Sequence, residues 1–192
     1  ARNKHGDNVL VQAALNGDTK SISLLLNKGA KINEQTRYGL TPLMWACKNG
    51  ETECARTLLE RGANIDIQSK MDGKTALMYT CYCNRLETCV LLLSYQPDVN
   101  LVEHQKGWTA AVFACFYDHL SILQLMLSSE GKIRVDERDK YGRPLSYYAK
   151  SPECRQILTD SQYNTQDTDH MEYTNIYTCN NQTHTEKERE SK

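Results

Sequence analysis

The sequence has almost no net charge and no long hydrophobic run. Its 192 residues include 23 Lys and Arg against 24 Asp and Glu, for a formal net charge of -1 at pH 7. That balance provides no long-range field to attract nucleic acid or an anionic membrane surface. No apolar stretch approaches the roughly 20 residues that a transmembrane helix needs. We therefore expect no nucleic acid partner and no membrane insertion.

The N-terminal stretch ARNKHGDN has neither the apolar core of a signal peptide nor an initiator Met. We therefore expect a monomeric domain that belongs to a longer chain. The eight cysteines favour a reducing compartment, because thiols persist there. The expected location is the cytoplasm, with the nucleus as an alternative.

Residue patterns of enzyme active sites are also missing. No GxxxxGK[ST] segment that could cradle a phosphate occurs, and the carboxylates are scattered along the chain. The five histidines form no arrangement with catalytic geometry, and His119, which follows an expected helix end, is expected to stabilise a turn. We expect no catalytic residue, no cofactor and no metal site.

The cysteines could form disulfides or a zinc site, but their spacing argues against both. Cys47, Cys81 and Cys115 follow one another at intervals of 34 residues. Equivalent positions in stacked helices lie about 8–10 Å apart. A disulfide requires Cα atoms within ~7 Å, and zinc requires all its ligands around one point. We interpret the three cysteines as small buried residues.

A short pattern recurs along the chain. The segments GLTPLMWACKNG, GKTALMYTCYCN and GWTAAVFACFYD begin at Gly39, Gly73 and Gly107, and weaker copies begin at Gly6 and Gly142. Successive glycines are separated by 33, 34, 34 and 35 residues. A fixed period of this length indicates stacked structural repeats.

Each copy predicts two short helices with a tight turn between them. Polar residues suited to cap the first helix stand at Asn8, Thr41, Thr75 and Thr109. Residues that tolerate a left-handed helix stop stand at Gly17, Gly50, Asn84 and Asp118. The second helix carries the apolar doublets Leu25-Leu26, Leu58-Leu59, Leu92-Leu93 and Met126-Leu127. An apolar-polar pair then leads to the next copy: Ile32-Asn33, Ile65-Asp66, Val99-Asn100 and Val135-Asp136.

This combination of period, caps, stops and leucine doublets resembles the ankyrin repeat. The resemblance implies an all-α solenoid of helix-turn-helix units with short β-hairpin loops, in an ankyrin repeat domain over residues 1–160. The expected repeats are 5–37, 38–70, 71–105 and 106–140, with a truncated capping repeat at 141–160. In that last copy, SPECRQIL is expected to form a shortened second helix. Lys150 replaces a small residue there, which suits a terminal repeat that faces water.

One set of aromatic residues recurs at a single repeat position. Trp45, Tyr79, Phe113 and Tyr148 are separated by 34, 34 and 35 residues, so they are expected to form a ladder across the stack. The ladder either packs as core between neighbouring repeats or lines the groove that receives a partner. The sequence leaves both interpretations open.

Other aromatic residues stand at positions that ankyrin repeats use to contact partners, as the resemblance implies. Those near the hairpin tips are Tyr38, Trp108 and Tyr141, and those at the ends of first helices are Tyr82, Phe116 and Tyr117. We expect these six to be exposed, and exposed aromatics indicate an interface. The remaining candidates for the interface are Leu40, Lys48, Asn49, Asp72, Lys74, Lys106 and Arg143. The basic members favour a partner with apolar anchors and acidic flanks.

From about residue 161 the period ends and the chain becomes polar, rich in Thr, Asn and Gln. Such a composition cannot bury a core, so residues 161–192 are expected to form a disordered tail. Within it, Tyr173 in the segment EYTNIY is a candidate phosphorylation site that could pair with Arg.

The resemblance implies a protein–protein interaction module, a scaffold or adaptor. It would bind another protein or a peptide segment through its concave groove and hairpin tips. The alternative is a regulatory ankyrin segment of a larger enzyme or channel, acting on its own catalytic or pore part. Under either hypothesis this segment is not itself an enzyme.

Overall fold

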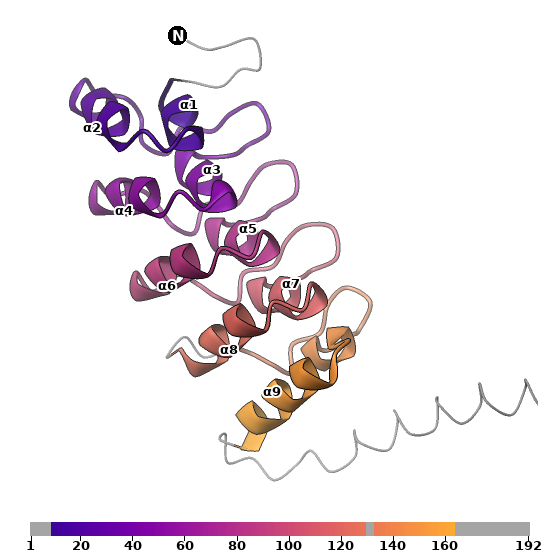
Figure 1. The fold of residues 1–192 in the computed structure, drawn as a ribbon. Coiled ribbons are helices and arrows are strands. Elements are labelled where there is room, and N and C mark those ends of the chain that lie inside the picture. The colour runs from indigo at the N-terminus through magenta and orange to yellow at the C-terminus, as the bar shows by residue number, and fades with distance from the viewer. Residues whose placement is uncertain (1–8, 130–132, 164–192) are drawn as a thin grey trace, which may run out of the picture. The chain divides into compact units, whose positions relative to one another are not determined.

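The computed structural model describes residues 9–129 and 133–163, which form nine α-helices and one 3-10 helix (Figure 1). Contacts divide the chain into residues 1–158 and 159–192, and the packing described below lies within the first unit. The expected cap Asn8 and residues 164–192 of the expected tail, with Tyr173, lie outside the described residues.

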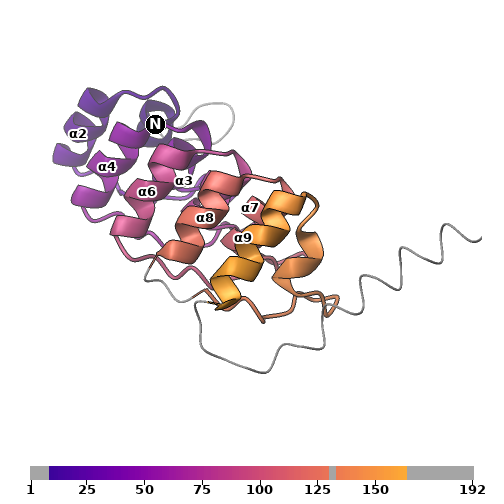
Figure 2. The same ribbon diagram turned by 60° about the horizontal axis from the view of Figure 1, so that its bottom comes forward.

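The helices of the first unit form two rows, and each of the first four repeats contributes one helix to each row (Figures 1 and 2). The first row contains α1 (Val9–Leu15), α3 (Pro42–Asn49), α5 (Ala76–Tyr82), α7 (Ala110–Phe116) and the 3-10 helix η1 (Leu145–Tyr148). The second row contains α2 (Thr19–Asn27), α4 (Thr52–Glu60), α6 (Leu86–Ser94) and α8 (Leu120–Ser128). Helix α9 (Pro152–Tyr163) follows η1. The expected all-α repeat solenoid is confirmed.

The helix starts and stops that the sequence predicts are confirmed where the structure describes them. The hydroxyls of Thr41, Thr75 and Thr109 accept hydrogen bonds from backbone N–H groups three residues later, at 3.2, 3.3 and 3.4 Å. Each bond satisfies a donor that the first helical turn leaves without a partner. The expected stops Gly17, Gly50, Asn84 and Asp118 have φ values of 72°, 81°, 55° and 60°.

Small side chains on the first helices form the contact between repeats. Ala46 and Cys47 on α3, Cys81 on α5, and Ala114 and Cys115 on α7 are completely buried. Side chains this small allow α3, α5 and α7 to pack closely against one another. The interpretation of the three periodic cysteines as buried packing residues is therefore confirmed.

Burial also sets the chemistry of these thiols. It raises the pKa of Cys47 to about 12 and that of Cys54 to about 11, so both remain protonated at neutral pH. The seven cysteines of the described residues are free thiols, and Cys83 is the partly exposed one among them. A protonated, buried thiol is a poor nucleophile and a poor metal ligand.

A ladder of polar side chains joins successive loops. The side-chain oxygens of Asn33, Asp66 and Asn100 each accept a hydrogen bond from a backbone N–H of the next repeat, at 3.0 Å in all three cases. These are the polar members of the apolar-polar pairs in the sequence. These polar residues recur at a regular spacing in the chain because each one links its repeat to the next.

The loop tips are hairpin-like turns, and the described residues contain no β-strand. One buried polar residue organises each tip: Thr36, Ser69, Glu103 and Asp139. In each case its side chain accepts hydrogen bonds from backbone N–H groups of the same turn. The turns therefore hold their shape through these local bonds and need no strand pairing.

The closing repeat differs from the expectation of a shortened second helix. Its first helix is the short one, because η1 has four residues, whereas α9 has 12 and α8 has nine. Ala149, the residue after η1, has an extended backbone with φ -73° and ψ 100°, and Pro152 disfavours helical conformation at Ser151, so η1 does not continue into α9. Lys150 is exposed, as expected for a terminal repeat.

Gly39 lies where neighbouring loops approach closely, and Gly62 lies in open space. Gly39 and Gly62 both have positive φ, but a Cβ on Gly39 would lie 2.6 Å from the Cβ of Lys70 and would overlap its backbone nitrogen, whereas a Cβ on Gly62 meets nothing within 4 Å. We expect Gly62→Ala to lower the free energy of unfolding by about 1–2 kcal/mol, because a residue with a Cβ is strained in the left-handed backbone conformation. Gly39→Ala should cost roughly 1–3 kcal/mol more. Urea denaturation followed by circular dichroism measures both, and equal costs would contradict this packing.

Candidate protein-binding surface

The structure divides the sequence-predicted site residues into three groups. The exposed group contains Tyr38, Tyr82, Lys106, Tyr117, Tyr141 and Arg143. The half-buried group contains Trp45, Lys48, Asn49, Asp72, Lys74 and Phe116. The buried group contains Leu40, Tyr79, Trp108 and Phe113. Members of the buried group have little side-chain surface to offer a partner.

The expectation that Trp108 is exposed is wrong. Its side chain is 4% exposed, because it turns inward between α7 and η1. The indole Nε1 donates a hydrogen bond of 3.0 Å to the hydroxyl of Tyr148, and its ring centroid lies 4.9 Å from that of Tyr148 and 5.4 Å from that of Phe113. Trp108 thus joins the fourth repeat to the closing repeat.

The aromatic ladder packs mainly as core. Tyr79, Phe113 and Tyr148 are buried, which decides between the two interpretations of the ladder for these three residues, and Trp45 is half-buried. Tyr79 also directs its hydroxyl to both carboxylate oxygens of Asp72, at 3.2 Å each. Burial raises the pKa of Tyr79, so the hydroxyl stays protonated and acts as a donor.

A continuous cluster of rings runs from α5 to the closing repeat. Tyr82 meets Tyr117 edge to face with centroids 5.0 Å apart, and Tyr117 meets Phe116 at the same distance. Phe116 then lies 4.9 Å from Trp108 and 6.1 Å from Tyr148. The Phe116–Trp108 pair is tilted, and the other three contacts are edge to face, an arrangement that stabilises aromatic pairs beyond the burial of their area. Tyr82 and Tyr117 remain exposed on top of this packed layer.

Basic side chains lie over the rings of this cluster and of the ladder. Lys150 Nζ lies 3.8 Å from the centroid of Phe116, and Lys106 Nζ lies 4.1 Å from that of Trp108. Lys48 Nζ lies 5.1 Å from the centroid of Trp45. All three distances fall within the range of cation–π attraction. The lysines are therefore held against the surface instead of extending freely into water.

One lysine of this face is neutralised by an ion pair. Lys74 Nζ lies 2.7 Å from Asp72 Oδ2, and both side chains are mostly buried. Burial favours the neutral form of Asp72, but hydrogen bonds from Lys74 and Ser69 outweigh it and hold the pKa of this carboxyl below its usual value. Asp72 and Lys74 therefore form a structural pair at the loop tip.

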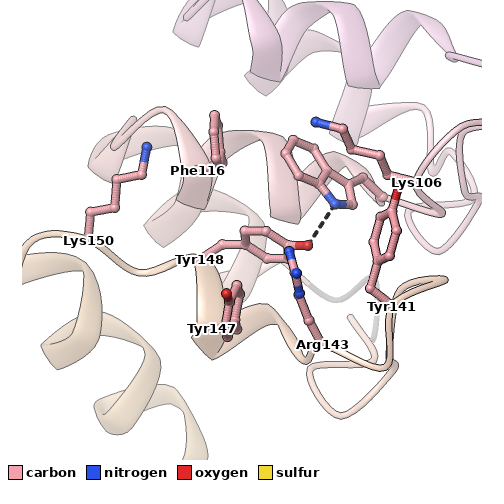
Figure 3. Close-up of a pocket in the computed structure, with 8 residues that line it drawn as sticks. Lys106, Phe116, Tyr141, Arg143, Tyr147, Tyr148 and Lys150 are labelled. Atoms are coloured by element: carbon pink, nitrogen blue, oxygen red, sulfur yellow. Dashed lines mark hydrogen bonds between the residues drawn. The ribbon is translucent and has the colours of Figure 1, made fainter. Parts of the chain in front are cut away.

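A pocket of about 410 Å³ opens between the fourth repeat and the closing repeat (Figure 3). It contains three residues that were not predicted as site residues: Tyr147, Tyr148 and Lys150. The ladder spacing indicates Tyr148 either as a core residue or as part of a groove, without naming it as a contact residue. Lys150 had been interpreted as a capping residue alone, because no sequence signal connects it with Phe116.

A buried carboxylate supports the floor of this pocket. The Tyr148 hydroxyl donates to Asp139 Oδ2, while Asp139 Oδ1 accepts from the backbone N–H groups of Tyr141 and Arg143 at 2.8 and 2.9 Å. Burial opposes ionisation, but these hydrogen bonds lower the pKa of Asp139. The carboxylate is thus ionised at neutral pH and fixes both the tyrosine and the loop.

A family model described as ankyrin repeats, in three copies, matches residues 10–103 and 66–139. The chain belongs to the ankyrin-repeat family. A search of curated proteins finds no match to the sequence. Ankyrin repeats are generally protein–protein interaction modules, and their fold is non-catalytic.

The described part of this ankyrin array offers no metal-binding group of three or more His, Cys, Asp or Glu residues. Within the same residues, every helix is too short or too polar to cross a bilayer. The feature of the described surface that a partner could recognise is the combination of aromatic rings with the Lys and Arg side chains that lie over them.

The hydroxyl of Tyr148 should stabilise the ankyrin array measurably. Tyr148→Phe leaves the buried Trp108 Nε1 without its acceptor, which is expected to cost about 1–3 kcal/mol. Tyr147→Phe is the matched control, because that side chain is exposed and the change should stay within about 0.5 kcal/mol. Chemical denaturation of both variants measures the difference, and a neutral Tyr148→Phe would refute the assigned hydrogen bond.

Asp139 should make stability depend on pH. Its folded pKa lies below the usual value of 3.8, so its contribution is present above that value and is lost as the pH falls through the folded pKa. Asp139→Asn should therefore lower the melting temperature at pH 7. It should also reduce the further fall in melting temperature below about pH 4, here called the acid limb. Glu60→Gln, an exposed change on α4, should leave the profile unaltered. Thermal melts from pH 2 to pH 7 compare the variants, and an undiminished acid limb in Asp139→Asn would contradict the role of this residue.

Proposed function

We propose that this ankyrin array binds a segment of another protein through its concave groove and hairpin tips, with the central contact at the ends of α5 and α7. One observation carries the proposal. Tyr82 and Tyr117 are 42% and 41% exposed, yet their rings meet each other edge to face. Two exposed aromatic rings in contact form a larger apolar surface than a single scattered side chain would.

The underlying packing favours these two tyrosines as anchors. Tyr82 contacts Phe113, with ring centroids 6.0 Å apart, and Tyr117 contacts Phe116, so both exposed rings rest on fixed neighbours. A side chain that is already held in place loses little entropy when a partner binds. Tyrosine also combines an apolar ring with a polar hydroxyl, which explains its frequency at interfaces.

The charges around the tyrosines indicate the chemistry of the partner. Lys48, Lys106 and Lys150 lie over aromatic rings, and none of them is within ion-pair distance of a carboxylate among the described residues. An acidic segment would match these charges and would be guided to the surface by them. The proposed partner segment therefore carries apolar anchors with acidic flanks.

The experiment is a selection of random peptides on the purified 192-residue chain, followed by fluorescence anisotropy with the enriched peptides. We expect peptides that combine aromatic or aliphatic residues with Asp or Glu. The Tyr82→Ala/Tyr117→Ala double variant should weaken their binding at least tenfold, since buried aromatic anchors at interfaces are worth about 2 kcal/mol or more. Trp108→Ala is unsuitable here, because Trp108 belongs to the core.

The matched control is Val90→Ala, which removes an exposed apolar side chain from α6 in the second row. Its affinity for the peptides should equal that of the wild type. Thermal melting confirms that each variant is folded. If the double variant folds and binds as well as Val90→Ala does, the tyrosine pair is not the contact surface.

A further inference from the structure

The pocket between the fourth repeat and the closing repeat has aromatic walls that remain open. Tyr141 and Tyr147 are 61% and 51% exposed, and Phe116 is half-buried. The floor consists of Trp108 and Tyr148, both buried and joined by a hydrogen bond. The volume of about 410 Å³ exceeds what a single carboxylate needs and is sufficient for an aromatic side chain with a charged substituent.

Three cations from three segments surround this space. Figure 3 shows Lys106, Arg143 and Lys150 around Tyr148. Lys106 comes from the loop before α7, Arg143 from the loop before η1, and Lys150 from the connection between η1 and α9. Their positions place positive charge on several sides of one cavity.

Each cation is held over a ring, so the charges are arranged before any ligand arrives. Lys150 lies over Phe116, Lys106 over Trp108, and the Arg143 guanidinium carbon lies 4.7 Å from the centroid of Tyr147. Preorganised donors lose less entropy on binding than flexible lysines on an open surface would.

No carboxylate lines the pocket. Glu103 and Asp139, in the two loops that border the pocket, are 3% and 9% exposed, and their oxygens accept hydrogen bonds from backbone N–H groups of those loops. Asp118, two residues after Phe116, is exposed and accepts a hydrogen bond from the Ser151 hydroxyl. Within the described residues, no ion pair involves Lys106, Arg143 or Lys150. The lining residues therefore carry positive charge alone, and the ionised Asp139 beneath the floor offsets part of it.

We propose that this pocket accepts a phosphotyrosine side chain of the partner protein; the proposal rests on the proposed protein-binding function and specifies the chemistry of one subsite. The ring of the phosphotyrosine packs between Tyr141, Tyr147 and Phe116. Its phosphate carries a charge of about −1.5 to −2 and three acceptor oxygens, which match the surrounding Lys and Arg donors. A glutamate would supply only one negative charge and would leave the aromatic walls without contact.

The experiment titrates the ¹⁵N-labelled 192-residue chain with four small probes and follows its NMR signals, including the indole N–H of Trp108. The probes are N-acetyl-phosphotyrosine amide, N-acetyl-tyrosine amide, N-acetyl-glutamate amide and inorganic phosphate. We expect the phosphotyrosine probe to bind at least tenfold more tightly than each of the other three, because it alone combines ring and dianion. The shifts should concentrate on the pocket residues.

Variants at the rim test the assignment. Arg143→Gln and Lys150→Met should each weaken the phosphotyrosine probe about tenfold, as expected for the loss of a charge-assisted hydrogen bond. The control Lys28→Met removes an exposed lysine at the end of α2 and should have no effect. Both rim residues are exposed, so their replacement should leave the fold intact, and thermal melting checks this.

Four outcomes overturn the proposal. Equal binding of inorganic phosphate means that the pocket attracts anions nonspecifically, and equal binding of the glutamate probe means that it is a carboxylate subsite. Binding that survives both rim substitutions places the phosphotyrosine elsewhere. In the fourth, the phosphotyrosine probe does not bind the pocket, and the proposed function still stands if the enriched peptides depend on Tyr82 and Tyr117. If the probe binds the pocket but the selection yields no peptide ligand, the proposed contact at Tyr82 and Tyr117 is wrong and the phosphotyrosine subsite remains.

Discussion

The contact between equivalent small helix faces is the interaction on which the whole array depends. Helices of seven or eight residues such as α3, α5 and α7 are too short to persist alone in water. Their small buried residues, with Cys47, Cys81 and Cys115 at the same position in each copy, let every helix lie directly against its neighbours. The array is therefore stabilised one interface at a time, as expected for a quasi-one-dimensional repeat protein.

The loops use different residues to do the same physical work. Thr36 and Ser69 organise their turns with a hydroxyl, whereas Glu103 and Asp139 use a carboxylate that accepts several N–H groups. The carboxylates occur in the two loops that border the aromatic pocket. These two turns consequently have more hydrogen bonds to their organising side chain than the turns at Thr36 and Ser69 do. The loops that border the pocket are therefore held more rigidly.

The sequence predicted those features that local chemistry controls. The period, the threonine caps and the left-handed stops at Asn84 and Asp118 follow from residues close to one another in the chain, and the structure has them where they were expected. The burial of Trp108 could not be predicted in this way, because its partner Tyr148 lies 40 residues away. The pocket was missed for a similar reason, since Lys150 reaches Phe116 only after η1 ends early.

The pocket is divided between two repeats that differ in how firmly they are held. Trp108 and Phe116 come from an internal repeat with neighbours on both sides, while Tyr147 and Lys150 come from the closing repeat. In arrays with nearest-neighbour coupling, the terminal unit opens most readily. Local unfolding at this end would separate the two halves of the cavity, so any ligand that bridges them would act as a clamp and raise the opening free energy of the last repeat.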